Sequence, residues 1–187
     1  MTQTQFNFFP THMFWKFPAV NAKEFISAVN KCSENEIDNT TFKWGSDCVI
    51  DRIPLKWEDW MQLMSPNLEY LSKDIGKSFK FIMYDPWISY YKRGHYQEMH
   101  DHMMQDLACV FFANSGEGFS RFIFSDRYNV TLNTPIKQLI GYKNVLNVDY
   151  AAGDIIFFPG HQLHHVTSHE SDVVRKTFAC NLAIDVV

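Results

Sequence analysis

Short runs of β-branched and aromatic residues recur along the chain after Gly76. Turns rich in Gly, Asn, Asp or Pro separate many of these runs, so each run is too short for a typical helix. Many short strands at close spacing predict a sandwich or barrel, and we favour the jelly roll. The predicted strands are Phe79–Tyr84, Trp87–Tyr91, Tyr96–His102, Leu107–Ala113, Phe119–Phe124, Val145–Tyr150, Asp154–Phe158, Leu163–Thr167 and Arg175–Ile184.

The N-terminal part reads as helical support for these strands. Asn21 is a predicted N-cap for a helix over Ala22–Lys31, whose inner stripe is Phe25, Ile26 and Val29. A second helical stretch covers about Lys56–Asp74, where Ser65-Pro66 resembles an N-cap and first helical position. We therefore expect two helices in sequence there.

The remaining segments complete a single predicted domain over residues 1–187. Its helical support spans about 20–76 and its jelly-roll core about 77–187. The first twenty residues, with Phe9-Pro10-Thr11, are predicted to form an edge strand, and Cys32–Asp51 a long loop.

The charge, hydropathy and cysteine spacing of the chain argue against several classes of protein. The chain of 187 residues has 17 basic and 21 acidic residues and a net charge of -4, which argues against nucleic acid as a partner. No apolar run is long enough for a membrane span, and the N-terminus does not read as a signal peptide. The four cysteines are far apart, so we expect reduced thiols and a cytoplasmic protein, with a homo-oligomer possible.

Seven of the eight histidines fall in two clusters about 60 residues apart in the sequence. In a strand, residues two apart share a face, so His100 and His102 can converge while Asp101 points away. The second cluster supplies a third ligand from another strand, and the pattern predicts a metal site with three imidazoles and open positions. By contrast, His12 and His169 are predicted to be ordinary hydrogen-bonded polar residues.

Several segments together resemble the Fe(II)/2-oxoglutarate-dependent oxygenases, and most closely a small bacterial and phage branch of them. That branch has the order W-x-N-x-x-x-x-G, H-x-H, a strand ending in F-P, a distal H-x-V, and R-x-S before a final strand. The resemblance covers nearly the whole chain and implies a double-stranded β-helix, which is a cupin-like jelly roll. The matching segments here are Phe9-Pro10-Thr11, Trp87–Gly94, His100-Asp101-His102, Ile155–Pro159, His164 and Arg175-Lys176-Thr177.

The resemblance also implies roles for individual residues. Its metal ligands match His100, His102 and His164. Its cosubstrate-binding residues match Arg175, for the distal carboxylate of 2-oxoglutarate, with Thr177 and Tyr91 as hydrogen-bond donors. For Arg175 a solvent-facing position is the competing reading, and for Tyr91 a plain core aromatic.

The alternation of side chains along a strand indicates which histidine of the second cluster is the ligand. Val166 continues the inward phase of His164, which places His165 on the other face, and His161 lies at the Pro159-Gly160 turn. We therefore predict that neither His165 nor His161 is a ligand.

Two departures from the wider family's pattern concern the site. His102 stands where most members have a carboxylate, and Asp101 would ligate only if a bulge re-aimed it. Ser89 stands where the branch usually has Asn. Asn181 matches the branch's terminal Asn but has no role that we can derive.

The implied activity is a dioxygenase that uses Fe(II), 2-oxoglutarate and O2 to hydroxylate a small molecule or a protein side chain. Cys32–Asp51 and Asn129–Lys143 are candidate loops over the barrel mouth. Alternatives are a zinc hydrolase or lyase, a cupin-like three-histidine metalloprotein without 2-oxoglutarate, and a structural protein whose histidines are incidental.

Overall fold

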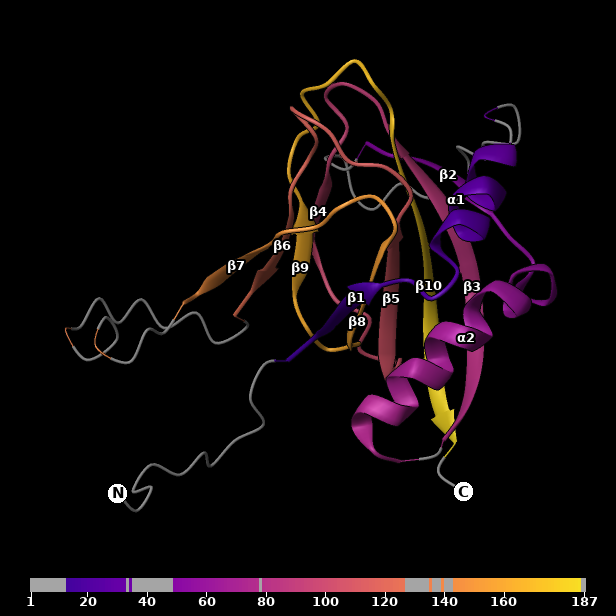
Figure 1. Cartoon of the computed structure of the whole chain (residues 1–187). Coiled ribbons are helices and arrows are strands. Elements are labelled where there is room, and N and C mark those ends of the chain that lie inside the picture. Colours follow the sequence, from indigo (N-terminus) through magenta and orange to yellow (C-terminus); the bar gives the residue numbers. More distant parts are fainter. Residues whose placement is uncertain are drawn as a thin grey trace.

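Two antiparallel sheets and two helices make up the described part of the chain, which covers residues 13–32, 34, 49–77, 79–126, 135, 139 and 143–185 of a computed structural model (Figure 1). The larger sheet has the order β1-β8-β5-β10-β3-β2, and the smaller one β4-β9-β6-β7. The helices are α1 (Ala22–Lys31) and α2 (Trp57–Ile75). The strands are β1 (Trp15–Pro18), β2 (Asp51–Pro54), β3 (Lys80–Tyr91), β4 (Gln97–His100), β5 (Leu107–Phe112), β6 (Phe122–Ser125), β7 (Val145–Val148), β8 (Asp154–Pro159), β9 (His164–Val166) and β10 (Arg175–Asp185).

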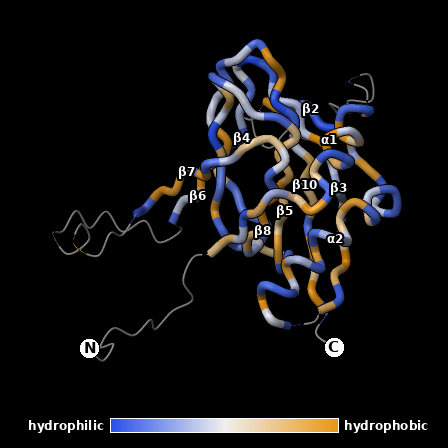
Figure 2. Tube along the Cα trace, in the orientation of Figure 1, coloured by the Kyte–Doolittle hydropathy of each residue, from blue (hydrophilic) through white to orange (hydrophobic). Residues whose placement is uncertain are grey.

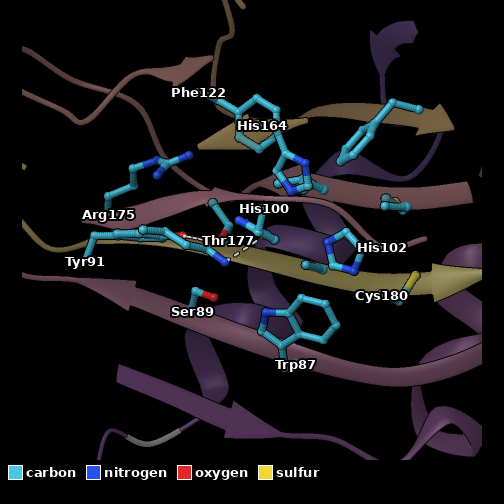
Figure 3. A pocket seen from close by; sticks show the side chains of 16 residues that line it. Trp87, Ser89, Tyr91, His100, His102, Phe122, His164, Arg175, Thr177 and Cys180 are labelled. Atoms are coloured by element: carbon cyan, nitrogen blue, oxygen red, sulfur yellow. Dashed lines mark hydrogen bonds between the residues drawn. The ribbon is translucent and has the colours of Figure 1, made fainter. Parts of the chain in front are cut away.

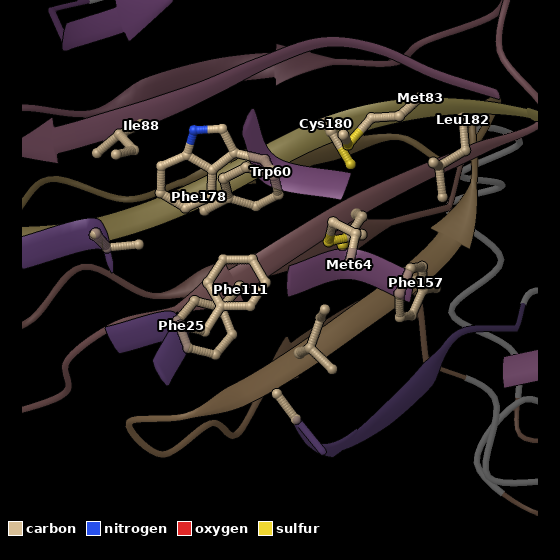
Figure 4. Packing of buried hydrophobic residues seen from close by; sticks show 14 of the residues in the cluster. Phe25, Trp60, Met64, Met83, Ile88, Phe111, Phe157, Phe178, Cys180 and Leu182 are labelled. Atoms are coloured by element: carbon tan, nitrogen blue, oxygen red, sulfur yellow. The ribbon is translucent and has the colours of Figure 1, made fainter. Parts of the chain in front are cut away.

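The central strands of the larger sheet are buried on both faces. In β5, Cys109 and Phe111 pack with the helices, whereas Val110 and Phe112 face the second sheet. A strand covered on both sides reads as a continuous apolar run, which explains the sequence of β5. Figure 4 shows the outer core, where α1 and α2 supply Phe25, Trp60 and Met64 against Phe111 and Phe178.

The smaller sheet closes the inner core. Phe122 and Phe124 of β6 and Val166 of β9 pack against inward residues of the larger sheet. This pair of facing sheets is the predicted jelly roll. Figure 2 shows apolar and polar segments alternating along α2, as expected for a helix with one face on a sheet.

The α2 segment is one helix, so the prediction of two consecutive helices was wrong. Pro66 lies inside it and lacks the N–H that a helix needs at that position. Two side chains donate to carbonyls of the preceding turn, with Ser65 Oγ 2.8 Å from the Met61 oxygen and Asn67 Nδ2 3.0 Å from the Leu63 oxygen. The buried stripe continues on both sides of the proline through Trp60, Met64, Leu68 and Leu71, and its packing keeps the helix continuous.

The first helix has the predicted bounds, but Asn21 does not cap it with its side chain. That amide instead donates to the Leu63 carbonyl at 3.1 Å and accepts from Asn67 Nδ2 at 3.0 Å. Asn21 therefore ties α1 to α2, because its polar atoms find partners on the neighbouring helix.

Two strand predictions need correction. The two runs before and after Pro86 form one strand, β3, whose register against β10 shifts opposite this proline. A proline cannot donate to the ladder and fits at a bulge, so it interrupts the pairing without ending the strand. The edge strand β2 was not predicted, and it pairs with β3. The predicted N-terminal edge strand is confirmed as β1, which pairs with β8 alone among the described residues.

Some predictions fall on residues outside the described ones. These are Phe9-Pro10-Thr11, His12, most of Cys32–Asp51, and nearly all of Asn129–Lys143. Of the cysteines, Cys109 and Cys180 are free thiols, and Cys48 lies outside the described residues. Neither described helix combines the length and hydropathy that a membrane span requires.

We predict that Gly160→Ala destabilises the fold and disturbs the His102 turn. A Cβ at Gly160 would overlap the carbonyl oxygens of Gln105 and His102, which are backbone atoms that cannot simply rotate away. We expect a loss of roughly 1–3 kcal/mol in the free energy of unfolding, measured by urea denaturation. Gly116→Ala is the control, because its Cβ would meet only the Phe119 ring, which can move. Equal losses in the two variants would contradict this steric argument.

Candidate metal centre

Three imidazoles converge between the two sheets. His100, His102 and His164 each offer a ring nitrogen, and these three atoms lie within 4.8 Å of one another. The His100 and His164 residues are direct cross-strand partners on β4 and β9, and their ring centroids are 4.1 Å apart. Figure 3 shows the three rings pointing into one pocket. A metal bound by all three would lie roughly 2.0–2.2 Å from each nitrogen.

Backbone carbonyls select the nitrogen that each strand histidine offers. His100 Nδ1 donates to the Glu98 oxygen at 2.8 Å, and His164 Nδ1 donates to the Gln162 oxygen at 2.9 Å. A neutral imidazole has one N–H, so Nε2 carries the lone pair in both rings. This is the arrangement of metal-binding histidines, whose second nitrogen donates to a carbonyl or carboxylate that fixes the ring.

His102 reaches the cluster from beyond the strand, because β4 ends at His100. The prediction that both histidines share a strand was therefore wrong in detail. The backbone N–H of His102 donates to the Gly160 oxygen at 2.7 Å, and the His102 ring stacks on Trp87 with centroids 6.3 Å apart. Asp101 is not part of the convergent cluster.

Burial keeps these imidazoles neutral. It lowers the pKa of both His100 and His102 to about 4, and the nearby Arg52 cation acts in the same direction. Burial also lowers the pKa of His164, followed by the effect of His100. Neutral rings near pH 7 present the lone pairs that a metal needs.

A buried guanidinium occupies the other end of the pocket. Arg175 has no exposed surface, so the solvent-facing reading is wrong. Its Nη1 donates to Ser120 Oγ at 3.1 Å, and its Cζ lies over the rings of Tyr91 at 4.6 Å and Tyr150 at 5.3 Å. Nε has no hydrogen-bond partner, and no carboxylate among the described residues pairs with this cation.

The other predicted cosubstrate residues line the same pocket. Thr177 and Ser89 are buried and lie opposite each other on β10 and β3. Tyr91 is also buried there and donates its hydroxyl to Gln97 Oε1 at 3.0 Å, so it is a pocket residue as well as a core aromatic.

The remaining histidines lie outside the cluster. His164 and Val166 are buried, whereas His165 between them is half-buried, as strand alternation predicts. His161 is exposed. Both nitrogens of His169 are engaged, with Nδ1 accepting from the Ser120 N–H at 3.2 Å and Nε2 donating to the Val173 oxygen at 2.8 Å.

Sequence reasoning missed Gln97 and Ser120. Gln97 lies three residues before His100, and simple alternation places it on the opposite face. Ser120 contacts Arg175 from a segment far away in the sequence. No local pattern marks either residue.

The comparisons with known proteins agree with this geometry. A family model described as "Putative 2OG-Fe(II) oxygenase" matches residues 85–181, which is more than half of the chain. The chain belongs to the 2OG-Fe(II) oxygenase family. The match includes the three histidines and Arg175, and the family implies Fe(II) and 2-oxoglutarate (2OG) as cofactor and cosubstrate. No curated protein matches the sequence.

Solved oxygenase structures share the fold at low sequence identity. A 2OG-Fe(II) oxygenase family oxidoreductase from Burkholderia pseudomallei is 11% identical with a TM-score of 0.65, covering 91% of this chain and 84% of that one. A Pseudomonas putida prolyl-4-hydroxylase is 12% identical with a TM-score of 0.66, covering 92% and 94%. HygX from Streptomyces hygroscopicus, solved with nickel and 2-oxoglutarate, is 10% identical with a TM-score of 0.64, covering 92% and 83%. The predicted double-stranded β-helix is thereby confirmed.

The residues present fit both groups that the family implies. Three convergent imidazole nitrogens suit a divalent transition metal and leave coordination positions for other ligands. The buried Arg175 suits the far carboxylate of a dicarboxylate, because a planar guanidinium can bind it through two hydrogen bonds. Metal binding and cosubstrate binding by these particular residues stay predictions.

The first prediction here is that replacing His100, His102 or His164 with Ala weakens Fe(II) binding by at least ~10²-fold, because each change removes a ligand. Anaerobic Fe(II) titration measures this. His161→Ala and His165→Ala are the controls and should bind as tightly as the wild type, and His169 is also expected to be dispensable as a ligand. Weak binding in either control, with a ligand variant unaffected, would contradict the assignment.

The second prediction is that the metal-free protein loses stability as the pH falls from about 6.5 toward 4. The folded-state pKa values of His100 and His102 are about 4. The unfolded chain therefore binds more protons in this window, and acid favours unfolding. Urea denaturation at pH 7 and pH 5 measures the loss, which should be smaller in His102→Gln than in the wild type. Equal losses in the two proteins would contradict the prediction.

Proposed function

We propose that the chain is an Fe(II)- and 2-oxoglutarate-dependent dioxygenase that hydroxylates a C–H bond of an organic substrate. The observation that carries the proposal is Arg175, a fully buried cation at one end of a pocket that has three neutral imidazoles at the other. A buried charge without a counter-ion is costly, and cation–π contacts offset only part of that cost. A dicarboxylate bridging the pocket would pair this cation.

Different residues of the pocket would bind the metal and the cosubstrate. His100, His102 and His164 would hold Fe(II), and Arg175 with the Thr177 hydroxyl would hold the distal carboxylate of 2-oxoglutarate. When bound, Fe(II) with 2-oxoglutarate and O2 supplies the oxidation, in which 2-oxoglutarate loses CO2 and becomes succinate while the substrate C–H becomes C–OH. The protein contributes orientation and a pocket wall of apolar rings.

Those rings exclude water from the site. Phe122 and Phe158 pack around His164, with ring centroids 5.4 Å and 4.8 Å from the imidazole, and Trp87 flanks His102. All three line the pocket. An apolar wall strengthens the charge interactions of Arg175 with a bound anion.

The substrate class extends to small molecules and protein side chains. One solved structure of similar fold is a prolyl-4-hydroxylase, and HygX has been solved with hygromycin B bound. The net charge of -4 favours a partner other than nucleic acid. We include in the proposal a cytoplasmic location, no membrane partner, and room for a homo-oligomer.

The alternatives predict a different pocket. A zinc hydrolase or lyase, or a three-histidine metalloprotein without 2-oxoglutarate, does not require a buried cation in the pocket that holds the metal ligands. A structural protein with incidental histidines would not converge three ring nitrogens and leave a buried guanidinium without a carboxylate among the described residues. The position of Arg175 therefore supports the oxygenase.

The test uses wild-type protein and Arg175→Met. Titrating anaerobic Fe(II)-loaded wild type with 2-oxoglutarate should give a weak visible metal-to-ligand charge-transfer band and a calorimetric binding signal. Arg175→Met should raise the Kd for 2-oxoglutarate by at least ~10²-fold, from loss of a charge-assisted pair of about 3 kcal/mol or more. Fe(II) binding should survive, because the ligands come from other elements.

Arg93→Met is the matched control. Arg93 is exposed and pairs with Asp172 at 2.7 Å, so its loss should leave 2-oxoglutarate binding unchanged. The proposal fails if the wild type binds no 2-oxoglutarate, or if Arg175→Met binds it as tightly as the wild type does.

A further inference from the structure

Gln97 faces the metal pocket because β4 contains a bulge. Gln97 pairs with Val166 and His100 pairs with His164, so three steps along β4 match two along β9. Without this extra residue, positions three apart would lie on opposite faces of the strand. The bulge instead turns both side chains into the pocket, where Gln97 is 7% exposed.

The Gln97 amide occupies the nitrogen of His100 that a metal would use. Its Nε2 lies 3.1 Å from His100 Nε2. His100 Nδ1 already donates to the Glu98 carbonyl, so Nε2 is the acceptor and the amide is the donor. The Tyr91 hydroxyl donates to Gln97 Oε1 at 3.0 Å and fixes which end of the amide faces the imidazole.

One lone pair cannot serve an N–H donor and a metal at the same time. Metal binding at His100 must therefore break the bond from Gln97. The ring does not need Gln97 for its orientation, because the Glu98 carbonyl holds Nδ1 at 2.8 Å. The amide thus competes with the metal for His100 without being required to position the ring.

The displaced amide then needs a new acceptor. It is buried, and a buried N–H without a partner is costly. The Gln97 amide contacts the Tyr91 hydroxyl, and the Arg175 Cζ lies 4.6 Å from the centroid of the Tyr91 ring. The amide therefore lies between the imidazoles and Arg175. A dicarboxylate spanning these two ends offers oxygen acceptors along this path.

We propose that Gln97 is a positioning residue with two states: it caps His100 Nε2 in the metal-free protein, and it donates to the oxygens of the cosubstrate in the metal-loaded protein. This inference rests on the proposed function, because it assigns 2-oxoglutarate to the same pocket. It makes Gln97 oppose metal binding and favour cosubstrate binding.

These opposite effects separate the proposal from a packing role. We expect Gln97→Leu to lower the Kd for Co(II), an air-stable stand-in for Fe(II), by roughly 3- to 10-fold, the worth of one hydrogen bond. The same variant, loaded with Co(II), should raise the Kd for 2-oxoglutarate by a similar factor. Calorimetry gives both constants, and the Co(II) absorption bands report directly on the ligand set.

Asn67→Leu is the matched control. Asn67 is a fully buried residue of α2 outside the pocket, and its amide donates to Asn21 Oδ1 and to the Leu63 oxygen. Losing this amide frees no imidazole, so Co(II) should not bind more tightly. Gln97→Met is the second variant, in case Gln97→Leu does not fold. Its side chain is about as long as that of glutamine but has no N–H to donate to His100, and the same two signs are expected.

The outcomes distinguish the two proposals. A wild-type protein that binds Co(II) but no 2-oxoglutarate overturns the proposed function and the inference with it. The inference alone is overturned if the wild type binds Co(II) and 2-oxoglutarate and the Gln97 variants either bind both more weakly or bind both as the wild type does. Tighter metal binding together with weaker 2-oxoglutarate binding supports it.

Discussion

The double burial of the larger sheet is the constraint on which the site depends. Residues of β5, β8 and β10 alternate between a core under the helices and a core under the smaller sheet. A one-residue slip in any of these strands would exchange the side chains of the two cores, and the close packing of both cores opposes such an exchange. Arg175 and Thr177 start β10, and their inward direction follows from this register. The sheet that carries the cosubstrate residues is thus fixed by packing that is unrelated to catalysis.

Individual hydrogen bonds position the three histidines, which lie on and beside the smaller sheet. β4 and β9 are short, and the two are joined by the pairs Gln97–Val166 and His100–His164. Backbone carbonyls orient the imidazoles of His100 and His164, and the Gly160 oxygen holds the backbone N–H of His102. Each of these carbonyls belongs to a residue close in sequence to a histidine or to the adjacent turn. The metal centre is therefore built from local hydrogen bonds on a frame that the larger sheet provides.

This difference explains which features of the fold and the site could be predicted from the sequence. The continuous apolar runs of β5 and β8 predict buried strands, and the histidine spacing, with the distant Arg175, matches a family pattern. The predictions that failed concern positions where contacts with distant parts of the chain, or a bulge, override the local sequence signal. Pro66 signals a helix end, but tertiary packing on both sides carries α2 through it. Pro86 signals a strand end, but it sits in a bulge. Gln97 is hidden by the bulge in β4, which shifts the face of a residue without changing any local composition.

The replacement of a carboxylate by His102 changes the electrostatics of the whole pocket. Three neutral imidazoles contribute no negative charge, and none of the described residues that line the pocket is Asp or Glu. A divalent metal there would leave its charge and that of Arg175 to be balanced by ligands rather than by protein carboxylates. 2-Oxoglutarate carries two negative charges, so metal and cosubstrate would each lower the cost of binding the other.

In the metal-free protein, no metal ion repels the Arg175 cation. Protein groups then take the place of the missing ligands in part. The Ser120 hydroxyl accepts from Nη1 of Arg175, and the Gln97 amide donates to His100 Nε2. The fold therefore tolerates an incomplete site, and the ligands that complete it would stabilise the folded state by mass action.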